Sequence, residues 1–122
     1  MARIMIVDDA EFMRMVIKDI LLKHGHEVVA EAARGEEAIF KYLEVRPDIV
    51  LMDIIMPDME GTETLQRLLN MDPEAKVVMC SSLGQQSVVT KSIKIGAQDF
   101  IVKPFEPSRI LDVIARIADQ NN

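Results

Sequence analysis

Five short apolar runs alternate with five helical patterns along the chain, and this alternation limits the possible folds more than any other feature. The predicted strands span residues 3–8, 26–32, 49–53, 76–81 and 100–103. Between them, apolar residues recur at intervals of three and four, which is the period of an amphipathic helix. Strands that are apolar throughout, rather than alternating, are typical of a parallel sheet that is covered on both faces. The sequence therefore predicts an α/β fold, with a doubly wound five-stranded parallel sheet and five helices.

Several glycines and prolines mark the ends of the predicted helices. Gly25 and Gly96 follow the first and the fourth helix, where a helix commonly stops. Pro47 ends the second helix, and Pro107 suits the first turn of the last one. The second helix is expected to present one apolar face, formed by Ala38, Ile39, Tyr42 and Leu43.

Length and charge bound the class of protein. With 122 residues, of which 49% are hydrophobic, the chain suits one domain over residues 1–122. A net charge of −6 without a basic run argues against nucleic acid as a partner. The apolar stretch 49–56 is too short to span a membrane, and no signal-peptide core precedes Asp8. The single cysteine, Cys80, excludes an internal disulfide, fits a reducing cytoplasm, and is expected to be buried and inert. We therefore expect a cytoplasmic protein without a membrane segment.

Polar side chains stand where the predicted strands end. Asp8 and Asp9 close the first strand, Asp53 the third, Ser81 the fourth and Lys103 the fifth. In open parallel sheets, ligands bind beyond the carboxyl ends of the strands, near a switch in strand order. These side chains are therefore expected to converge on one edge of the sheet. Helix capping is the simpler explanation for an acid at such a place, but one aspartate suffices for it and two are present.

Three ionised carboxylates within about 5 Å repel by roughly 3 kcal/mol per pair at an effective dielectric near 20. Protonation would relieve this repulsion, but a hard divalent cation is the usual solution, and few protein ligands favour Mg²⁺ over Ca²⁺. The open positions of such a cation suit phosphoryl oxygens, and Lys103 and Ser81 could meet others. The chain has neither a GxxxxGK[ST] nor a GxGxxG motif, which argues against a bound nucleotide. Asp53, on the central strand, is the candidate nucleophile for an acyl phosphate.

Four segments carry a resemblance to a known family. They are IVDD, LMDIIMPDMEG, CSS and FIVKPF, in this order. Together they resemble the receiver domain of two-component response regulators over residues 3–118, and most of all the single-domain regulators of chemotaxis. The resemblance implies strand order 2-1-3-4-5, and a protein that catalyses only its own phosphorylation and dephosphorylation. It also implies a monomer whose partners are a histidine kinase and a flagellar motor switch protein or another output protein.

The resemblance implies a role for each residue of the site. Asp53 would accept the phosphoryl group from a phosphohistidine. Asp9, Asp53 and the backbone carbonyl of Ile55 would bind Mg²⁺ directly, and Asp8 would act mainly through a water molecule.

The same resemblance implies a conformational switch. Ser81 and Lys103 would contact the phosphoryl group, although Ser82 competes with Ser81 for this role. Phe100 would change rotamer together with Ser81, and the last two strand–helix units would form the output surface. The family also implies a cis peptide bond between Lys103 and Pro104, which the X-Pro linkage permits.

Two positions depart from the better known chemotaxis pattern. Phe100 stands where a tyrosine is frequent, so any part of switching that needs a hydroxyl is absent. Ile55 and Leu83 lie two residues after Asp53 and Ser81, and neither side chain can orient a water molecule for hydrolysis. We therefore expect slow autodephosphorylation.

Two other functions remain open at the level of sequence. A receiver could act as a phosphorelay intermediate or as an adaptor outside chemotaxis. An Asp-nucleophile phosphohydrolase of the haloacid dehalogenase type would have the motif D-x-D after its first strand. This chain instead has two adjacent acids there, and it is too short for a cap domain.

Overall fold

The computed structural model describes residues 1–82 and 85–120 and consists of five strands and five helices. The strands are β1 Arg3–Val7, β2 Glu27–Ala32, β3 Ile49–Asp53, β4 Val77–Ser81 and β5 Asp99–Val102. The helices are α1 Glu11–Lys23, α2 Gly35–Val45, α3 Gly61–Met71, α4 Gln86–Ile95 and α5 Pro107–Asp119. All strand pairs are parallel, and the strands lie in the order β2-β1-β3-β4-β5. The predicted fold and strand order are confirmed.

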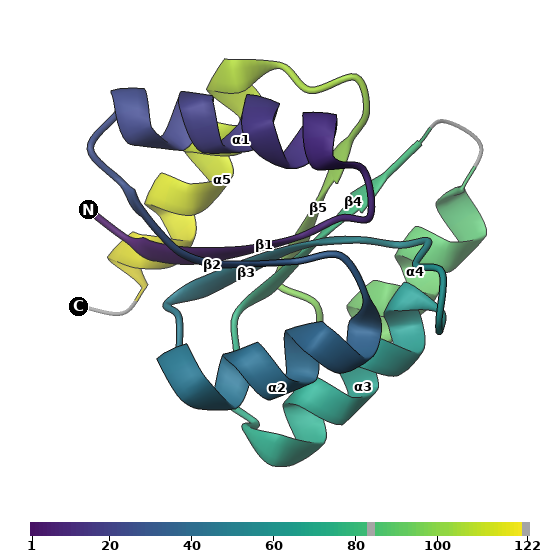
Figure 1. Ribbon diagram of the computed structural model, residues 1–122. Coiled ribbons are helices and arrows are strands. Elements are labelled where there is room, and N and C mark those ends of the chain that lie inside the picture. The colour runs from purple at the N-terminus through teal and green to yellow at the C-terminus, as the bar shows by residue number, and fades with distance from the viewer. Residues whose placement is uncertain (83–84, 121–122) are drawn as a thin grey trace.

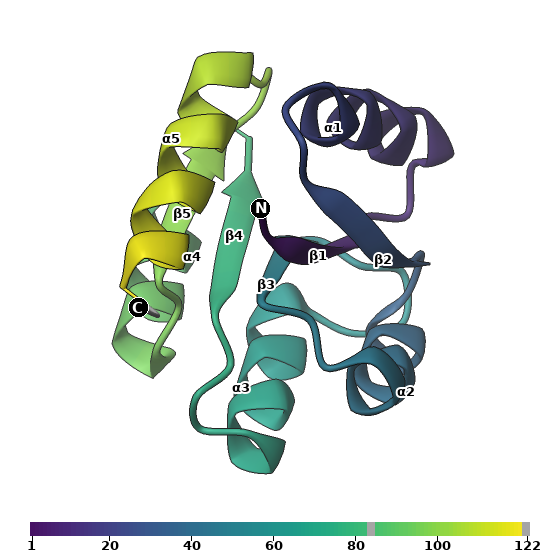
Figure 2. The ribbon, with the colours of Figure 1, turned by 90° about the vertical axis from the view of Figure 1, so that its left-hand side faces the viewer.

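The sheet separates two layers of helices (Figures 1 and 2). Helices α1 and α5 cover one face, and α2, α3 and α4 cover the other. Each face has its own buried apolar cluster, because side chains alternate between the two sides of every strand. On β1, for example, Ile4 and Ile6 belong to the α1–α5 side, whereas Met5 and Val7 belong to the opposite side. Within the described part of the chain, none of the helices has the length and apolar character needed to cross a membrane.

Most element boundaries lie within one residue of the predicted ones, and the main error concerns a helix face. Leu43 is 47% exposed, although the helical spacing predicted it on the buried side of α2. Helix α2 packs on β2, the edge strand of the sheet, and on α3. An amphipathic helix buries only a stripe of its surface, roughly 100° wide, against its neighbours. Gly35, Ala38, Ile39 and Tyr42 fill that stripe, and Leu43 lies beyond it.

Strand register explains which side chains meet at the carboxyl edge. Val7 on β1 pairs with Met52 on β3, so the residues that follow them, Asp8 and Asp53, come side by side. Asp53 in turn pairs with Cys80 on β4. Ser81 pairs with Val102 on β5, and this register places Lys103 just beyond the sheet.

Candidate functional site

Three aspartates converge at this edge of the sheet. Carboxylate oxygens of Asp8, Asp9 and Asp53 all lie within 4.8 Å of one another. The Asp8 side chain is buried, that of Asp9 is exposed, and that of Asp53 is intermediate. The cluster therefore opens to solvent on the side of Asp9. Such a set of hard oxygen donors fits a divalent cation that keeps part of its water shell.

Lys103 lies across two of these acids. Its Nζ is 3.1 Å from Asp8 Oδ2 and 3.0 Å from Asp53 Oδ2. Its backbone N–H donates to the carbonyl of Ser81 at 2.6 Å, which ties the start of the β5–α5 loop to β4. The sequence predicted Lys103 at this edge but did not predict its ion pair with Asp8. The Lys103–Pro104 peptide bond is cis, as the resemblance implied.

The ion pair and burial have opposite effects on the pKa values of Asp53 and Lys103. Burial raises the pKa of Asp53, the hydrogen bond and charge of Lys103 oppose this rise, and the charge of Asp8 adds to it, so the pKa of Asp53 stays above its usual value. Burial alone would lower the pKa of Lys103, but the bonds and charges of Asp53 and Asp8 outweigh it and raise that pKa. Lys103 is therefore cationic at neutral pH.

The loop from β3 to α3 is fixed by two features that sequence reasoning missed. A Cβ at Gly61 would lie 2.5 Å from the carbonyl oxygen of Ile54, so only glycine permits this close approach. The two carboxylate oxygens of Asp58 accept from the backbone N–H groups of Gly35, at 2.8 Å, and Glu36, at 3.0 Å. Asp58 thereby caps α2, and no local signal predicts this because more than twenty residues separate the partners.

Ile55 lies in the same loop, next to the acids. Its side chain is 63% exposed, and its backbone N–H lies 3.4 Å from Asp53 Oδ1. The second apolar position predicted to slow hydrolysis, Leu83, lies outside the described residues.

The candidate switch residues lie on the neighbouring strands. Ser81 ends β4 and is buried, whereas Ser82 is exposed. Phe100, on β5, is half-buried. Ser81 and Phe100 both line a cavity of about 500 Å³ beside α4. Val89, Ile93 and Val102 give this cavity a largely apolar wall.

Cys80 precedes Ser81 on β4 and is buried, as predicted. Burial raises the pKa of its thiol to about 12. The thiol is therefore protonated at neutral pH and unsuited to act as a nucleophile.

Comparison with known proteins identifies the family. A model of the response regulator receiver domain matches residues 4–115. The chain belongs to this family. It is 52% identical over 116 residues to the chemotaxis protein CheY of Thermotoga maritima, covering 95% of this chain and 97% of that protein. It is 56% identical over 112 residues to CheY of Bacillus subtilis, covering 92% of this chain and 93% of the relative.

A solved structure supports the same relationship. The chain is similar to one in the CheX–CheY–BeF₃–Mg²⁺ complex from Borrelia burgdorferi, with a TM-score of 0.90 and 35% identity. The match covers 94% of this chain and 87% of that one. The chain is thus a receiver domain closely related to CheY, which places it in two-component phosphorelay signalling and supports a role in chemotaxis. The family match favours this function over the phosphohydrolase that the sequence left open.

Proposed function

We propose that this protein is a single-domain response regulator of chemotaxis that accepts a phosphoryl group on Asp53. The donor is the phosphohistidine of a histidine kinase, and the reaction depends on Mg²⁺. One observation above all supports this proposal. Three carboxylates meet at the carboxyl edge of the sheet, and a lysine from the fifth strand reaches two of them.

The donor set fits Mg²⁺ in number and chemistry. Asp9 and Asp53 are the proposed direct protein ligands, with the backbone carbonyl of Ile55, and Asp8 acts through a water molecule. Both carboxylate oxygens of Asp8 already accept hydrogen bonds, from the backbone N–H of Ala10 at 2.9 Å and from Lys103. Asp9 is exposed and therefore accessible to a hydrated cation. Bound Mg²⁺ supplies positive charge for the oxygens of the transferring phosphoryl group.

The chain's own residues then account for the transfer. A carboxylate oxygen of Asp53 attacks phosphorus, and a P–O bond forms while the P–N bond of phosphohistidine breaks. The electron pair of that bond goes to the imidazole, which carries a proton on its other nitrogen and leaves as neutral histidine. Lys103 exchanges its contact with Asp53 for a phosphoryl oxygen, and the Ser81 hydroxyl donates to another.

The output surface is proposed to lie on the units β4–α4 and β5–α5. Ser81 and Phe100 line one cavity, so a movement of Ser81 toward a phosphoryl group changes the space open to the phenyl ring. Ile93 and Val102 stand at 43% and 36% exposure on this side of the molecule, where they offer apolar contacts. A flagellar motor switch protein is the proposed partner, with a relay or adaptor partner as the alternative.

Intact-mass spectrometry after incubation with acetyl phosphate and Mg²⁺ tests the proposal. We expect one phosphoryl adduct per chain. The adduct should not form when a chelator removes Mg²⁺ before the reaction, and it should be absent from Asp53→Asn. Asp48→Asn is the matched control, because it makes the same change at the opposite end of the strand region, where Asp48 accepts from the backbone N–H of Arg3.

The outcomes separate the candidate functions. An adduct that persists in Asp53→Asn would refute the assignment of the phosphoacceptor. Repeated turnover of a small phosphate ester without an adduct would favour a phosphohydrolase instead.

A further inference from the structure

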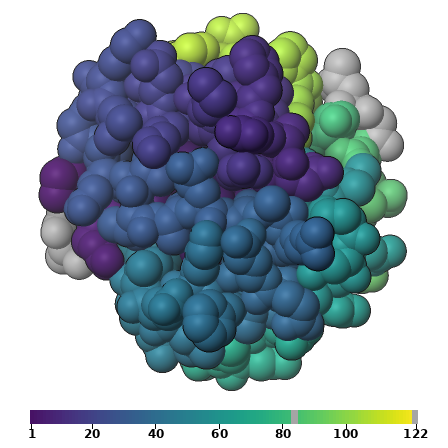
Figure 3. All heavy atoms as spheres, viewed as in Figure 1, coloured from purple at the N-terminus to yellow at the C-terminus, as the bar shows by residue number. Residues whose placement is uncertain are grey.

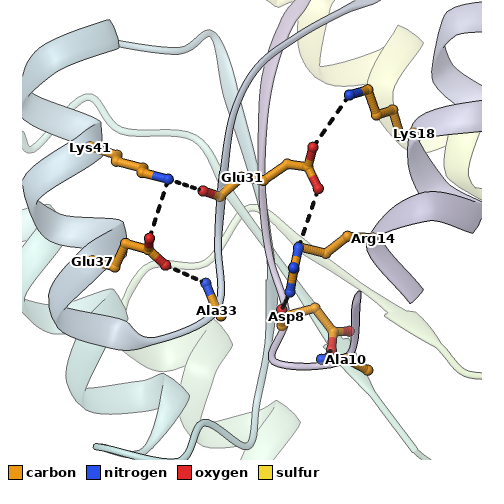
Figure 4. Close-up of polar contacts among 8 residues, drawn as sticks. All are labelled: Asp8, Ala10, Arg14, Lys18, Glu31, Ala33, Glu37 and Lys41. Atoms are coloured by element: carbon orange, nitrogen blue, oxygen red, sulfur yellow. Dashed lines mark hydrogen bonds and ion pairs between the residues drawn. The ribbon is translucent and has the colours of Figure 1, made fainter. Parts of the chain in front are cut away.

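The acidic loop between β1 and α1 is held partly by residues that the proposed function does not use. Asp8 is fixed through all of its polar groups. Its backbone N–H donates to the carbonyl of Ala32 at 3.0 Å, and its carboxylate bonds Ala10 and Lys103. Its own carbonyl oxygen accepts from Arg14 Nη1 at 2.5 Å (Figure 4).

The contact between Arg14 and this carbonyl controls the direction in which the chain leaves Asp8. The carbonyl of Asp8 and the N–H of Asp9 belong to one planar peptide unit. A hydrogen bond to the carbonyl oxygen therefore fixes the plane from which Asp9 projects. Asp9 is the exposed member of the acidic cluster. Within the described contacts, its carboxylate accepts fewer hydrogen bonds than those of Asp8 and Asp53.

Arg14 is itself held in place by Glu31. The guanidinium Nε donates to Glu31 Oε1 at 3.2 Å while Nη1 reaches the Asp8 carbonyl. The Arg14 side chain is only 16% exposed, which distinguishes this contact from an ordinary surface ion pair. Two donors at a fixed angle are a property of the planar guanidinium, and a lysine cannot reproduce them.

The support continues across the edge strand to the next helix. Lys41 on α2 donates to the backbone carbonyl of Glu31 at 2.5 Å and pairs with Glu37 at 3.3 Å. Glu37 accepts from the backbone N–H of Ala33 at 2.6 Å. Figure 4 shows these contacts as one chain from α2 through β2 to the acidic loop. In Figure 3, residues of α1 and of α2, which cover opposite faces of the sheet, are both visible on the side that faces the viewer.

We infer that Arg14, held by Glu31, is a positioning residue that orients the Asp8–Asp9 peptide and thereby sets the affinity for Mg²⁺. The inference rests on the proposed function, because it needs Asp9 as a ligand. Mg²⁺ demands near-ideal octahedral geometry, so a rotation of this peptide weakens binding. Residues that orient metal ligands typically contribute 10- to 100-fold to metal affinity.

Isothermal titration calorimetry with Mg²⁺, in the absence of any phosphodonor, measures the affinity for Mg²⁺ and tests this role. We expect Arg14→Met to weaken Mg²⁺ binding by about 10- to 100-fold. Arg14→Lys keeps the charge but loses the paired donors, so it also weakens binding. The matched control is Lys18→Met, because Lys18 pairs with the other carboxylate oxygen of Glu31 at 3.4 Å and is 45% exposed. This control is expected to bind Mg²⁺ as the wild type does.

The sign of the effect separates positioning from simple electrostatics. Loss of a positive charge near a cation site would by itself tighten Mg²⁺ binding, so unchanged or tighter binding in Arg14→Met overturns the inference. Glu31→Gln should weaken binding less than Arg14→Met. The double variant should match Arg14→Met, because Glu31 acts through Arg14. Additive losses in the double variant would contradict this order of action.

Phosphorylation by acetyl phosphate provides a second readout. In Arg14→Met, the rate should reach half its maximum at a correspondingly higher Mg²⁺ concentration, whereas the rate at saturating Mg²⁺ should stay close to that of the wild type. Equal Mg²⁺ dependence would refute the inference even if Arg14→Met lowers stability. Failure of the wild-type chain to bind Mg²⁺ would overturn the proposed function, and this inference with it.

Discussion

Replacement of Lys103 by methionine removes the cation that faces the acidic cluster, and its effect on stability can be worked out from the structure. The ammonium lies 3.0 Å from Asp53 and 3.1 Å from Asp8, and each contact corresponds to about 5 kcal/mol of attraction at an effective dielectric near 20. The three carboxylates lie within 4.8 Å of one another, which gives about 3.5 kcal/mol of repulsion per pair on the same scale. The attraction from Lys103 thus offsets repulsion of similar size.

Part of this gross attraction is offset by the desolvation of the charges. Breaking a buried ion pair by removing one partner typically costs 3–5 kcal/mol. The side chains of Lys103, Asp8 and Asp53 are 18%, 3% and 13% exposed, so this range applies. We therefore expect Lys103→Met to lower the free energy of unfolding by about 3–5 kcal/mol at pH 7, measured with a chelator present to keep the protein free of Mg²⁺.

Urea unfolding followed by far-UV circular dichroism measures this loss. Lys23→Met is the matched control, because Lys23 also lies 3.0 Å from its partner, Asp19, but both side chains are more than 60% exposed. The control should change the free energy of unfolding by less than about 1 kcal/mol. Excess Mg²⁺ should stabilise Lys103→Met more than the wild type, because it neutralises carboxylates that Lys103 no longer pairs. A loss no larger than that of the control, or equal stabilisation by Mg²⁺, would refute this reasoning.

Three further predictions concern the site and the core. Asp9→Ala should weaken Mg²⁺ binding more than Asp8→Ala in calorimetric titrations, and equal effects would contradict the assignment of the pair. The acyl phosphate should be long-lived, because Ile55 cannot orient water; loss of phosphoryl label with a half-life of seconds would exclude this. Tyr42→Phe removes the bond from the hydroxyl to Asp72 Oδ2 at 2.6 Å and should lower the free energy of unfolding by about 1.5–3 kcal/mol at pH 7. That bond holds the pKa of Asp72 below its usual value, so its stabilisation is present above about pH 4 and is lost as the pH falls. The difference in urea stability between wild type and variant should therefore narrow at pH 3, and a constant difference would contradict the linkage.

Local patterns in the sequence account for the fold class and for the location of the candidate site. Strands and helices follow from the spacing of apolar residues, which depends only on neighbours in the chain. Parallel strands end at one edge of a sheet, so Asp8, Asp53 and Lys103 could be assigned to that edge before any contact was known. The order of the strands was not available from these patterns and came from the resemblance to the receiver family.

Contacts between distant residues were decided only by the tertiary structure. Lys103 and Asp8 are 95 residues apart, and their ion pair depends on strand register and side-chain reach together. The bond from Arg14 to Glu31, which lies 17 residues away on β2, likewise needs α1 to pack beside that strand. The exposure of Leu43 depends on the place of α2 over the sheet edge. A short window of sequence specifies which face of an element is apolar, but what that face meets is determined by the packing of elements that lie far apart in the chain.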